Sequence, residues 1–332
     1  MKTKISKKRF LYPSRKNGSI LIISLWTLLF LSFFCATLAF VVYAKINTAK
    51  HLKERMLSYY LAKAGAEAAF QVLQKDETEY DFFGDAWSDD ESLFKEVSLG
   101  AGNFTVSYDY AGNTYYGLSD ESSKLNLNTA LQKALVLFFS MSGCADSQAV
   151  QLAECVIDWR DVDNEPFPRG AEDDYYNNLE IPYNCKDANF ESIEEVLLVK
   201  GMNNEIFSGI KENVTVFGNG AVNVNTADRK VLIALGIKQS LADKIINYRL
   251  KPGGVVVGDE GFFKNIDEIS EKINLSEDET EIIDSLKTAN IISVSTSVFR
   301  AGCAGKLNNS DITGEIVYIL NRTGKIYYWK QK

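Results

Sequence analysis

The side chains best placed to do chemistry in this chain are carboxylates crowded into one loop. Seven acids lie between residues 158 and 174: Asp158, Asp161, Asp163, Glu165, Glu172, Asp173 and Asp174. Pro166, Pro168 and Gly170 in the same stretch favour a fixed, irregular loop over a helix. Carboxylates held close together repel one another unless a cation or an arginine neutralises them. The loop is therefore either a cation site or a solvated acidic surface, with Arg160 and Arg169 as candidate counter-charges.

A cation bound by this loop is expected to be calcium. Oxygen ligands without histidine or cysteine suit a hard cation, and an irregular loop suits the flexible coordination that calcium accepts. The candidate ligands are Asp161, Asp163, Glu172 and Asp173, with Glu165 and Asp174 as further candidates. Four acids of the loop follow the spacing of an EF-hand, but Pro166 stands where that loop needs glycine. The sequence thus predicts a calcium site that is not an EF-hand.

Histidine and cysteine chemistry is restricted by number and position. The chain has one histidine, His51, which argues against a histidine-based metal site or a Ser-His-Asp triad. Cys35 lies in an apolar segment, and four cysteines follow it: Cys144, Cys155, Cys185 and Cys303. Their spacing contains no CxxC metal motif, and in an oxidising compartment they permit three full disulfide pairings. We expect disulfides among these four, without a preferred pairing.

The amino-terminal part combines a basic leader with a long apolar segment. Seven basic residues and no acid precede Gly18, whereas the rest of the chain carries 29 basic and 44 acidic side chains. The uncharged run that ends at Ala44 forms about 39 Å of helix, enough to cross a bilayer. The basic leader places the amino terminus in the cytoplasm. Because helical spacing of apolar residues continues to near Gln74, the segment differs from a cleaved secretory signal.

An internal repeat organises the middle of the chain. LNLNTA at residues 125–130 recurs as VNVNTA at residues 222–227, and an apolar helical pattern follows each copy. Further on, FESIEEVLLVKGM at 190–202 corresponds to FKNIDEISEKINL at 263–275. We expect two tandem helical units, about 125–210 and 222–288, within an inserted domain over 125–288. Turns at Gly201 and Gly236 are typical of helix-hairpin-helix units.

Two groups of motifs resemble a known family. A short basic leader that ends in Gly18, followed at once by an apolar helix, resembles the leader of type IV pilins and pseudopilins, which a prepilin peptidase cuts after the glycine. Ser19 would then be the first mature residue. Most family members carry glutamate at mature position five, whereas Ile23 stands here and resembles minor pseudopilin K of type II secretion systems. The stretch VIDWRDVDNEPFPRGAEDDYY, with LNLNTA and FESIEEVLLVKGM, resembles the signature region of the protein K family.

The resemblance, together with the strand patterns, predicts an α+β fold. Residues 102–118 and the end of the chain alternate apolar with polar or β-branched residues, as strands do. We expect a pilin-like long N-terminal helix packed on an antiparallel sheet, interrupted by an inserted all-α domain of two helix-hairpin-helix (SAM-like) units. The expected segments are a leader (1–18), a membrane helix (19–44), a first pilin-like part (45–124), the insertion (125–288) and C-terminal strands (289–332).

The resemblance implies a non-enzymatic minor pseudopilin that binds calcium. Such a protein is anchored by one span in the inner, cytoplasmic membrane, with its amino terminus cytoplasmic and its bulk periplasmic. It is processed by the prepilin peptidase and joins other minor pseudopilins at the tip of a pseudopilus that moves proteins across the outer membrane. A bulky insertion and Ile23 suit a subunit that caps a filament.

Two other functions are compatible with parts of the sequence. A membrane-anchored DNA-uptake receptor would use the helix-hairpin-helix units, but their basic residues are scattered and the chain after the leader is acidic. We therefore expect no nucleic acid partner. An anchored periplasmic hydrolase would use paired carboxylates of the acidic loop as acid and base.

Overall fold

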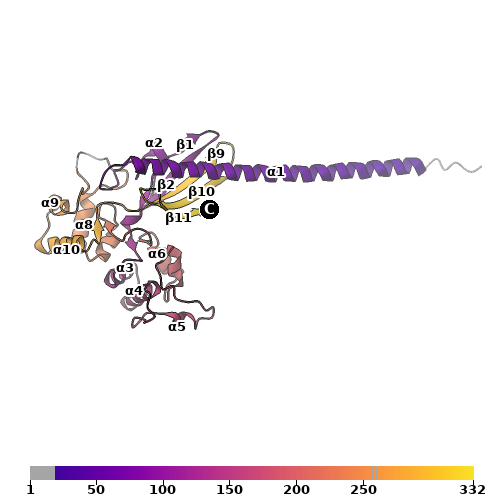
Figure 1. Ribbon diagram of the computed structural model, residues 1–332. Helices are drawn as coiled ribbons and strands as arrows, with labels where there is room; N and C mark the ends of the chain where they lie inside the picture. Colours follow the sequence, from indigo (N-terminus) through magenta and orange to yellow (C-terminus); the bar gives the residue numbers. More distant parts are fainter. Residues whose placement is uncertain (1–18, 256–257, 259) are drawn as a thin grey trace, which may run out of the picture. The chain divides into compact units, whose positions relative to one another are not determined.

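The computed structural model describes residues 19–255, 258 and 260–332 (Figure 1). The chain forms two compact units that divide after Glu54. The first helix, α1 (Ser19–Lys75), begins in the first unit and ends in the second. Gly18 and the basic leader lie outside the described residues, so cleavage after Gly18 stays a prediction.

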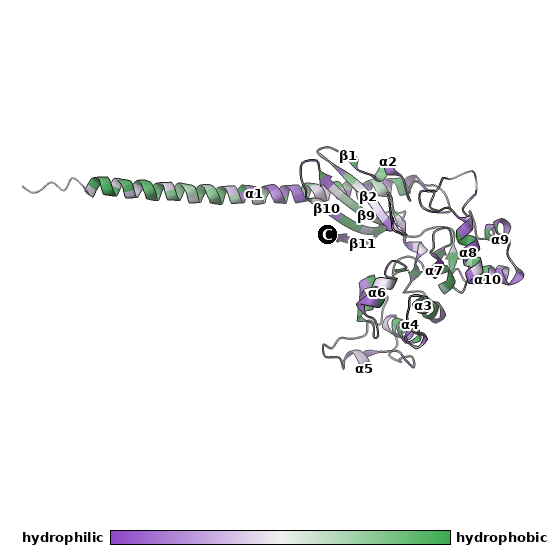
Figure 2. Cartoon of the chain, turned by 180° about the vertical axis from the view of Figure 1, so that it is seen from behind, coloured by the Kyte–Doolittle hydropathy of each residue, from purple (hydrophilic) through white to green (hydrophobic). Residues whose placement is uncertain are grey.

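The described part of the first unit is an exposed, mainly apolar helix. Large hydrophobic side chains from Ile20 to Ile46 are exposed, and Figure 2 shows this part of α1 as mainly hydrophobic. The hydroxyls of Ser24, Thr27 and Ser32 each donate a hydrogen bond of 2.9 Å to the backbone carbonyl three residues earlier. The helix thereby satisfies its own polar groups, as a membrane-spanning segment must. By length and composition it fits a single-pass anchor.

The second unit contains an antiparallel sheet built from both ends of its chain (Figure 1). The strand order is β1 (Val97–Leu99), β2 (Gly102–Tyr110), β9 (Phe299–Leu307), β10 (Thr313–Leu320) and β11 (Ile326–Gln331). Two short strands extend it, because β3 (Asn113–Tyr115) pairs with β2 and β4 (Ser119–Asp120) pairs with β9. A short helix, α2 (Glu91–Phe94), precedes β1. Since β2 and β9 pair directly, the predicted union of early and late strands is confirmed.

Small residues let the end of α1 lie against the backbone of this sheet. A Cβ atom added to Gly305 of β9 would lie 2.2 Å from the carbonyl oxygen of Ser58, and one on Gly314 of β10 would lie 2.6 Å from the carbonyl carbon of the same residue. Neither position has room for a larger side chain. The buried hydroxyl of Tyr318 donates a 2.6 Å hydrogen bond to the Ala66 carbonyl. The helix and the sheet therefore form one core.

Two helical sets follow, each bounded by a pair of two-residue strands. The first set lies between β5 (Leu125–Asn126) and β6 (Val214–Thr215) and comprises α3 (Gln132–Met141), α4 (Asp146–Arg160), α5 (Asp173–Tyr176), a 3-10 helix (Ile193–Leu198) and α6 (Asn204–Ile210). The second lies between β7 (Val222–Asn223) and β8 (Ile292–Ser293) and comprises α7 (Arg229–Ala234), α8 (Gln239–Tyr248), α9 (Glu268–Lys272) and α10 (Glu277–Thr288). β5 pairs with β6 in parallel, and β7 pairs with β8 in the same way. The two ends of each set therefore lie side by side.

The repeated sequence motifs make the same contacts in both sets. The Asn128 side chain donates to the Phe190 carbonyl (3.0 Å) and accepts from the Phe190 N–H (2.7 Å). In the second set, Asn225 and Phe263 form the same reciprocal pair, with both distances 2.9 Å. The second asparagine of each LNLN-type motif thus fastens the phenylalanine that opens the downstream motif.

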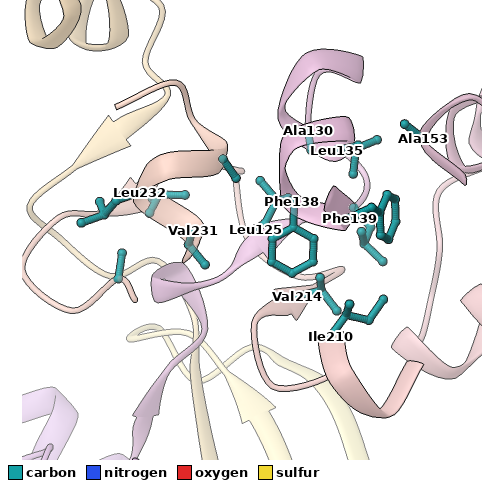
Figure 3. Packing of buried hydrophobic residues seen from close by; sticks show 14 of the residues in the cluster. Leu125, Ala130, Leu135, Phe138, Phe139, Ala153, Ile210, Val214, Val231 and Leu232 are labelled. Atoms are coloured by element: carbon teal, nitrogen blue, oxygen red, sulfur yellow. The ribbon is translucent and has the colours of Figure 1, made fainter. Parts of the chain in front are cut away.

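The two sets share one hydrophobic core. Figure 3 shows Phe138 and Phe139 of α3 in the same cluster as Val231 and Leu232 of α7. All four side chains are fully buried. The repeats are therefore packed on each other rather than separated by a linker.

A buried carboxylate joins the sheet to the second helical set. Asp120 at the end of β4 is 3% exposed and accepts side-chain hydrogen bonds from Asn223 (3.0 Å), Thr226 (2.5 Å) and Thr296 (2.7 Å). It also accepts from the backbone N–H of Ser122 (2.6 Å). With four donors, this buried side chain has the partners that a carboxylate out of water requires.

Candidate metal centre

The acidic loop is fastened to α4 by a buried aspartate. Asp158, in the last turn of α4, accepts hydrogen bonds from the backbone N–H groups of Phe167 (3.3 Å) and Ala171 (2.7 Å). A Cβ atom at Gly170 would lie 1.7 Å from Asp158 Oδ2, so this approach requires glycine. Asp158 therefore holds the backbone of the loop in a fixed path, as the prolines and glycine of the sequence predict.

Three of the predicted ligands converge at this loop. Asp161, Asp163 and Glu172 each place a carboxylate oxygen so that the three atoms lie within 4.8 Å of one another, and we call them the oxygen triad. Glu172 is only 3% exposed. Neither of its oxygens has a hydrogen-bond partner among the described residues, and the same holds for Asp161 Oδ1.

The electrostatics of the oxygen triad call for a cation. Burial, with smaller contributions from the nearby carboxylates of Asp158 and Asp161, raises the pKa of Glu172 to about 7. Burial also raises the pKa of Asp161, with Asp163 contributing. A buried, unpaired carboxylate costs several kcal/mol, and a metal ion is one of the few groups that removes this cost. The all-oxygen donor set fits a hard divalent cation such as calcium.

Arg160, one of the two expected counter-charges, does not form an ion pair with the oxygen triad. Arg160 donates to two backbone carbonyls, one of them that of Ala130 at 2.7 Å. A second acidic group in the chain is different, because Arg322 pairs with both Asp76 (3.0 Å) and Asp81. No ion pair of that kind reaches the oxygen triad within the described part of the chain.

Two residues that the sequence analysis did not select as metal ligands lie beside Glu172. One ligand atom from each of Glu172, Cys185 and Asp187 falls within 4.8 Å of the other two, and we call these residues the thiol triad. Cys185 is 6% exposed and Asp187 is exposed. Asp187 has a φ of 50°, a left-handed conformation that aspartate tolerates better than most residues. The sequence signal that could have indicated these two ligands is the spacing of Cys185 and Asp187, two residues apart and soon after the acidic loop.

The remaining predicted ligands do not join either triad. Asp173 Oδ1 accepts a 2.8 Å hydrogen bond from the backbone N–H of Cys185, so this carboxylate positions Cys185, and its role as a ligand stays a prediction. Glu165 and Asp174 also lie outside both groups. The backbone N–H of Glu165 donates to Asp163 Oδ1 (3.0 Å), which helps to orient that ligand.

The cysteines do not form the expected disulfides in this structure. All five are free. Cys303 lies in the core between α1 and the sheet, whereas Cys144, Cys155 and Cys185 lie in the core of the helical sets. Burial raises the pKa of the Cys155 thiol to about 12, and its sulfur donates to the Arg169 carbonyl (3.5 Å). The buried thiols thus behave as small apolar side chains.

Comparison with known proteins identifies the chain's relatives. The family model described as Type II secretion system (T2SS), protein K matches residues 117–219, the segment that holds both triads. The type II secretion system protein K of Pectobacterium carotovorum subsp. carotovorum is 26% identical over 227 residues, which are 64% of this chain and 66% of that protein. The chain is similar to type II secretion system protein K.

A solved structure supports the same fold. A chain in the crystal structure of the GspK-GspI-GspJ complex from the enterotoxigenic Escherichia coli type 2 secretion system superposes with a TM-score of 0.68 at 17% identity. The match covers 86% of this chain and 99% of that chain. The long N-terminal helix, the antiparallel sheet and the additional helices therefore belong to a known architecture, and the resemblance read from the sequence is confirmed.

Proposed function

We propose that this protein K relative is a minor pseudopilin that acts in type II secretion by assembly and without catalysis. The observation that carries the proposal is the protein K match over residues 117–219. It is supported by the exposed apolar start of α1 and by the close packing of the end of α1 on the sheet. A single helix of this kind suits a subunit that leaves the membrane to join a filament.

The chain would be anchored in the inner membrane before assembly. The basic leader would remain cytoplasmic, the bulk of the chain would be periplasmic, and a prepilin peptidase would cut after Gly18 so that Ser19 becomes the amino terminus. Ser19 is helical, so the proposed mature chain would start within α1.

The tip of the pseudopilus is the proposed position. Ile23 lacks the charge that most pilin-like subunits use to meet a neighbour inside the membrane, and the helical sets add bulk that would hinder stacking along a filament. We propose that the SAM-like hairpins serve protein packing. Their bases support this role, because Lys238 pairs with Asp278 (3.0 Å) and Lys244 with Glu279 (2.7 Å), which leaves these cations less available to DNA phosphates.

We propose that calcium bound by the oxygen triad stabilises the loop between α4 and α5 in the first helical set. The ion would replace the missing partners of Glu172 and Asp161 and so hold the loop between α4 and α5. Asp163 would complete the protein ligands, and water would fill the remaining positions of the flexible coordination shell.

Co-purification tests the assembly role. The GspK relative was solved together with GspI and GspJ, and we propose that this chain likewise binds the other minor pseudopilins of its own genome. Tagged full-length chain, extracted in detergent with calcium, should retain them. Asp161→Asn should weaken this retention if calcium orders the loop, whereas Asp174→Asn, an exposed acid outside both triads, should not. Failure of the unaltered chain to retain any minor pseudopilin would overturn the proposal.

A further inference from the structure

We propose that β11 and the groove beside it bind an extended segment of a partner protein in which acidic and apolar residues alternate. The segment would add to the sheet as a further strand. β11 forms one edge of the sheet, and β10 is its one neighbour among the described strands (Figure 1). The site shares no residue with either metal triad and does not depend on the assembly role.

The open side of β11 can form hydrogen bonds with another strand. The backbone N–H of Lys332 donates to the Glu315 carbonyl of β10 (3.0 Å). Because the backbone groups of successive residues point to opposite sides of a strand, those of Gln331 and Trp329 point away from β10. Unpaired edge groups of this kind are where an extended peptide adds to a sheet.

Three large apolar side chains of this edge strand are exposed. Ile326, Tyr327 and Trp329 are 51%, 40% and 37% exposed. Exposed edge strands usually avoid such side chains, because they invite pairing with another chain. The ring of Trp329 lies 5.7 Å from that of Tyr318, on the sheet face that packs against α1. Apolar residues of an added strand would cover this area.

The opposite face of β11 borders a groove. Tyr328, Lys330 and Lys332 alternate with Trp329 and therefore lie on the face turned away from α1. There they line a cavity together with the 3-10 helix and the end of α6. We call this cavity the basic groove, and its lining residues are Lys124, Ile193, Glu194, Phe207, Lys211, Glu212, Arg300, Val317, Tyr328, Lys330 and Lys332.

The charge of the basic groove is opposite to that of the chain around it. Five of its lining residues are basic and two are acidic, whereas the chain after Gly18 carries 29 basic and 44 acidic side chains. Of the two acids, Glu212 is exposed and lies 3.9 Å from Lys211. The groove therefore favours an acidic ligand.

Lys330 and Lys332 are the cations available to such a ligand. Lys124 pairs with the buried Glu121 (2.7 Å), and Arg300 lies 3.8 Å from the same carboxylate. Lys330 and Lys332 are exposed and form no ion pair within the residues that the structure describes.

The two faces of β11 together select the pattern of the ligand. Side chains of an added strand alternate between the faces, so acids on one face would meet Lys330 and Lys332 while apolar residues on the other meet Trp329. A second copy of this chain fits less well. It would bring two basic grooves together, and like charges on paired strands are destabilising.

Binding of short peptides tests the proposal. The probe is a fluorescent peptide of about eight residues, within the usual length of a strand, in which glutamate and valine alternate. The full chain, purified in detergent, should raise the fluorescence anisotropy of the probe, and its affinity should fall as salt is added. The matched control has the same residues in one block of glutamates and one of valines. It should bind more weakly, because it places glutamate on both faces.

Variants locate the binding site on β11. Lys330→Gln combined with Lys332→Gln should weaken binding by about tenfold, because each exposed ion pair contributes a factor of a few. Lys133→Gln combined with Lys251→Gln changes the net charge equally at exposed lysines outside the basic groove and should leave the affinity unchanged. Gln331→Pro removes an N–H of the open edge without altering the ladder to β10 and should weaken binding, whereas Gln331→Ala should not.

Four results would overturn the proposal. They are absence of binding, equal affinity for the two peptides, an unchanged affinity in the variant that lacks both Lys330 and Lys332, and a dimer of the chain that forms without peptide and is lost in Gln331→Pro. The last result would mean that a second copy occupies the edge. Retention of minor pseudopilins is a separate measurement on the unaltered chain, so failure of either proposal can be told from failure of the other.

Discussion

Replacing Glu172 by glutamine should have opposite effects on stability with and without calcium. In the absence of metal, burial raises the pKa of this carboxyl from 4.5 to about 7. Below about pH 4.5 the group is neutral in both the folded and the unfolded state, so it does not lower the free energy of unfolding. Because the folded-state pKa is raised, the free energy of unfolding falls as the pH rises from about 4.5 through about 7. The difference corresponds to about 3 kcal/mol. In chelator, Glu172→Gln should match the parent protein near about pH 4.5 and be more stable by up to that amount near about pH 8.

Calcium should reverse this order. The parent protein should gain about 2.7 kcal/mol when free calcium exceeds its dissociation constant by about a hundredfold, and the variant should gain little. Urea unfolding of the second unit in the full-length chain, followed by near-ultraviolet circular dichroism, measures both quantities. Burial also raises the pKa values of Asp158 and Asp161 beside Glu172, but both proteins share these two groups, so their contributions largely cancel in the difference. Glu165→Gln is the matched control, because this exposed acid of the same loop lies outside both triads.

One result would refute the reasoning. If Glu172→Gln proved less stable than the parent protein in chelator near about pH 8, the ionised carboxylate would have a partner within the protein. The case for a cation at the oxygen triad would then lose its main support.

Three further outcomes are expected. Gly305→Val should lower the unfolding free energy by about 3 kcal/mol or prevent folding, because its Cβ would meet the Ser58 carbonyl at 2.2 Å, whereas Gly209→Ala, with open space around it, should have little effect in the same thermal melt. Titration of the denatured, unreduced protein with a thiol reagent should count five thiols, and a count of three or one would show that disulfides form. Gly18→Val should block leader removal in cells with the prepilin peptidase, so that mass spectrometry finds the leader still attached in place of a chain beginning at Ser19.

The sequence predicts the fold well where the signal is local or repeated. The apolar run before Ala44 and the helical spacing beyond it predict one continuous helix, which α1 confirms. The LNLNTA repeat predicts two similar helical sets. The structure confirms them, because the second asparagine of each copy bonds to the first phenylalanine of its downstream motif, Asn128 to Phe190 and Asn225 to Phe263. Alternation at both ends of the globular part predicts strands, although only the structure shows that β2 pairs with β9.

The candidate site is predicted only in part, because its geometry depends on contacts distant in sequence. Asp161, Asp163 and Glu172 could be selected since they share one loop. Asp187 lies beyond α5, and nothing in the local pattern tells that the chain returns to the loop there. Asp173, another predicted ligand, lies in the first turn of α5 and accepts a hydrogen bond from the backbone N–H of Cys185, a contact that the sequence does not show.

The paired strands at the ends of each helical set have an evolutionary consequence. β5 and β6 place the first and last residues of one set side by side, and β7 and β8 do so for the other. A segment whose two ends are adjacent can be inserted, copied or deleted without separating the strands on either side of it. Duplication of one ancestral segment would explain both the repeated motifs and their shared core, while the sheet around the insertion kept its pairing. The loop with the two triads belongs to the first copy, so a metal site could arise there while the second copy kept only the packing role.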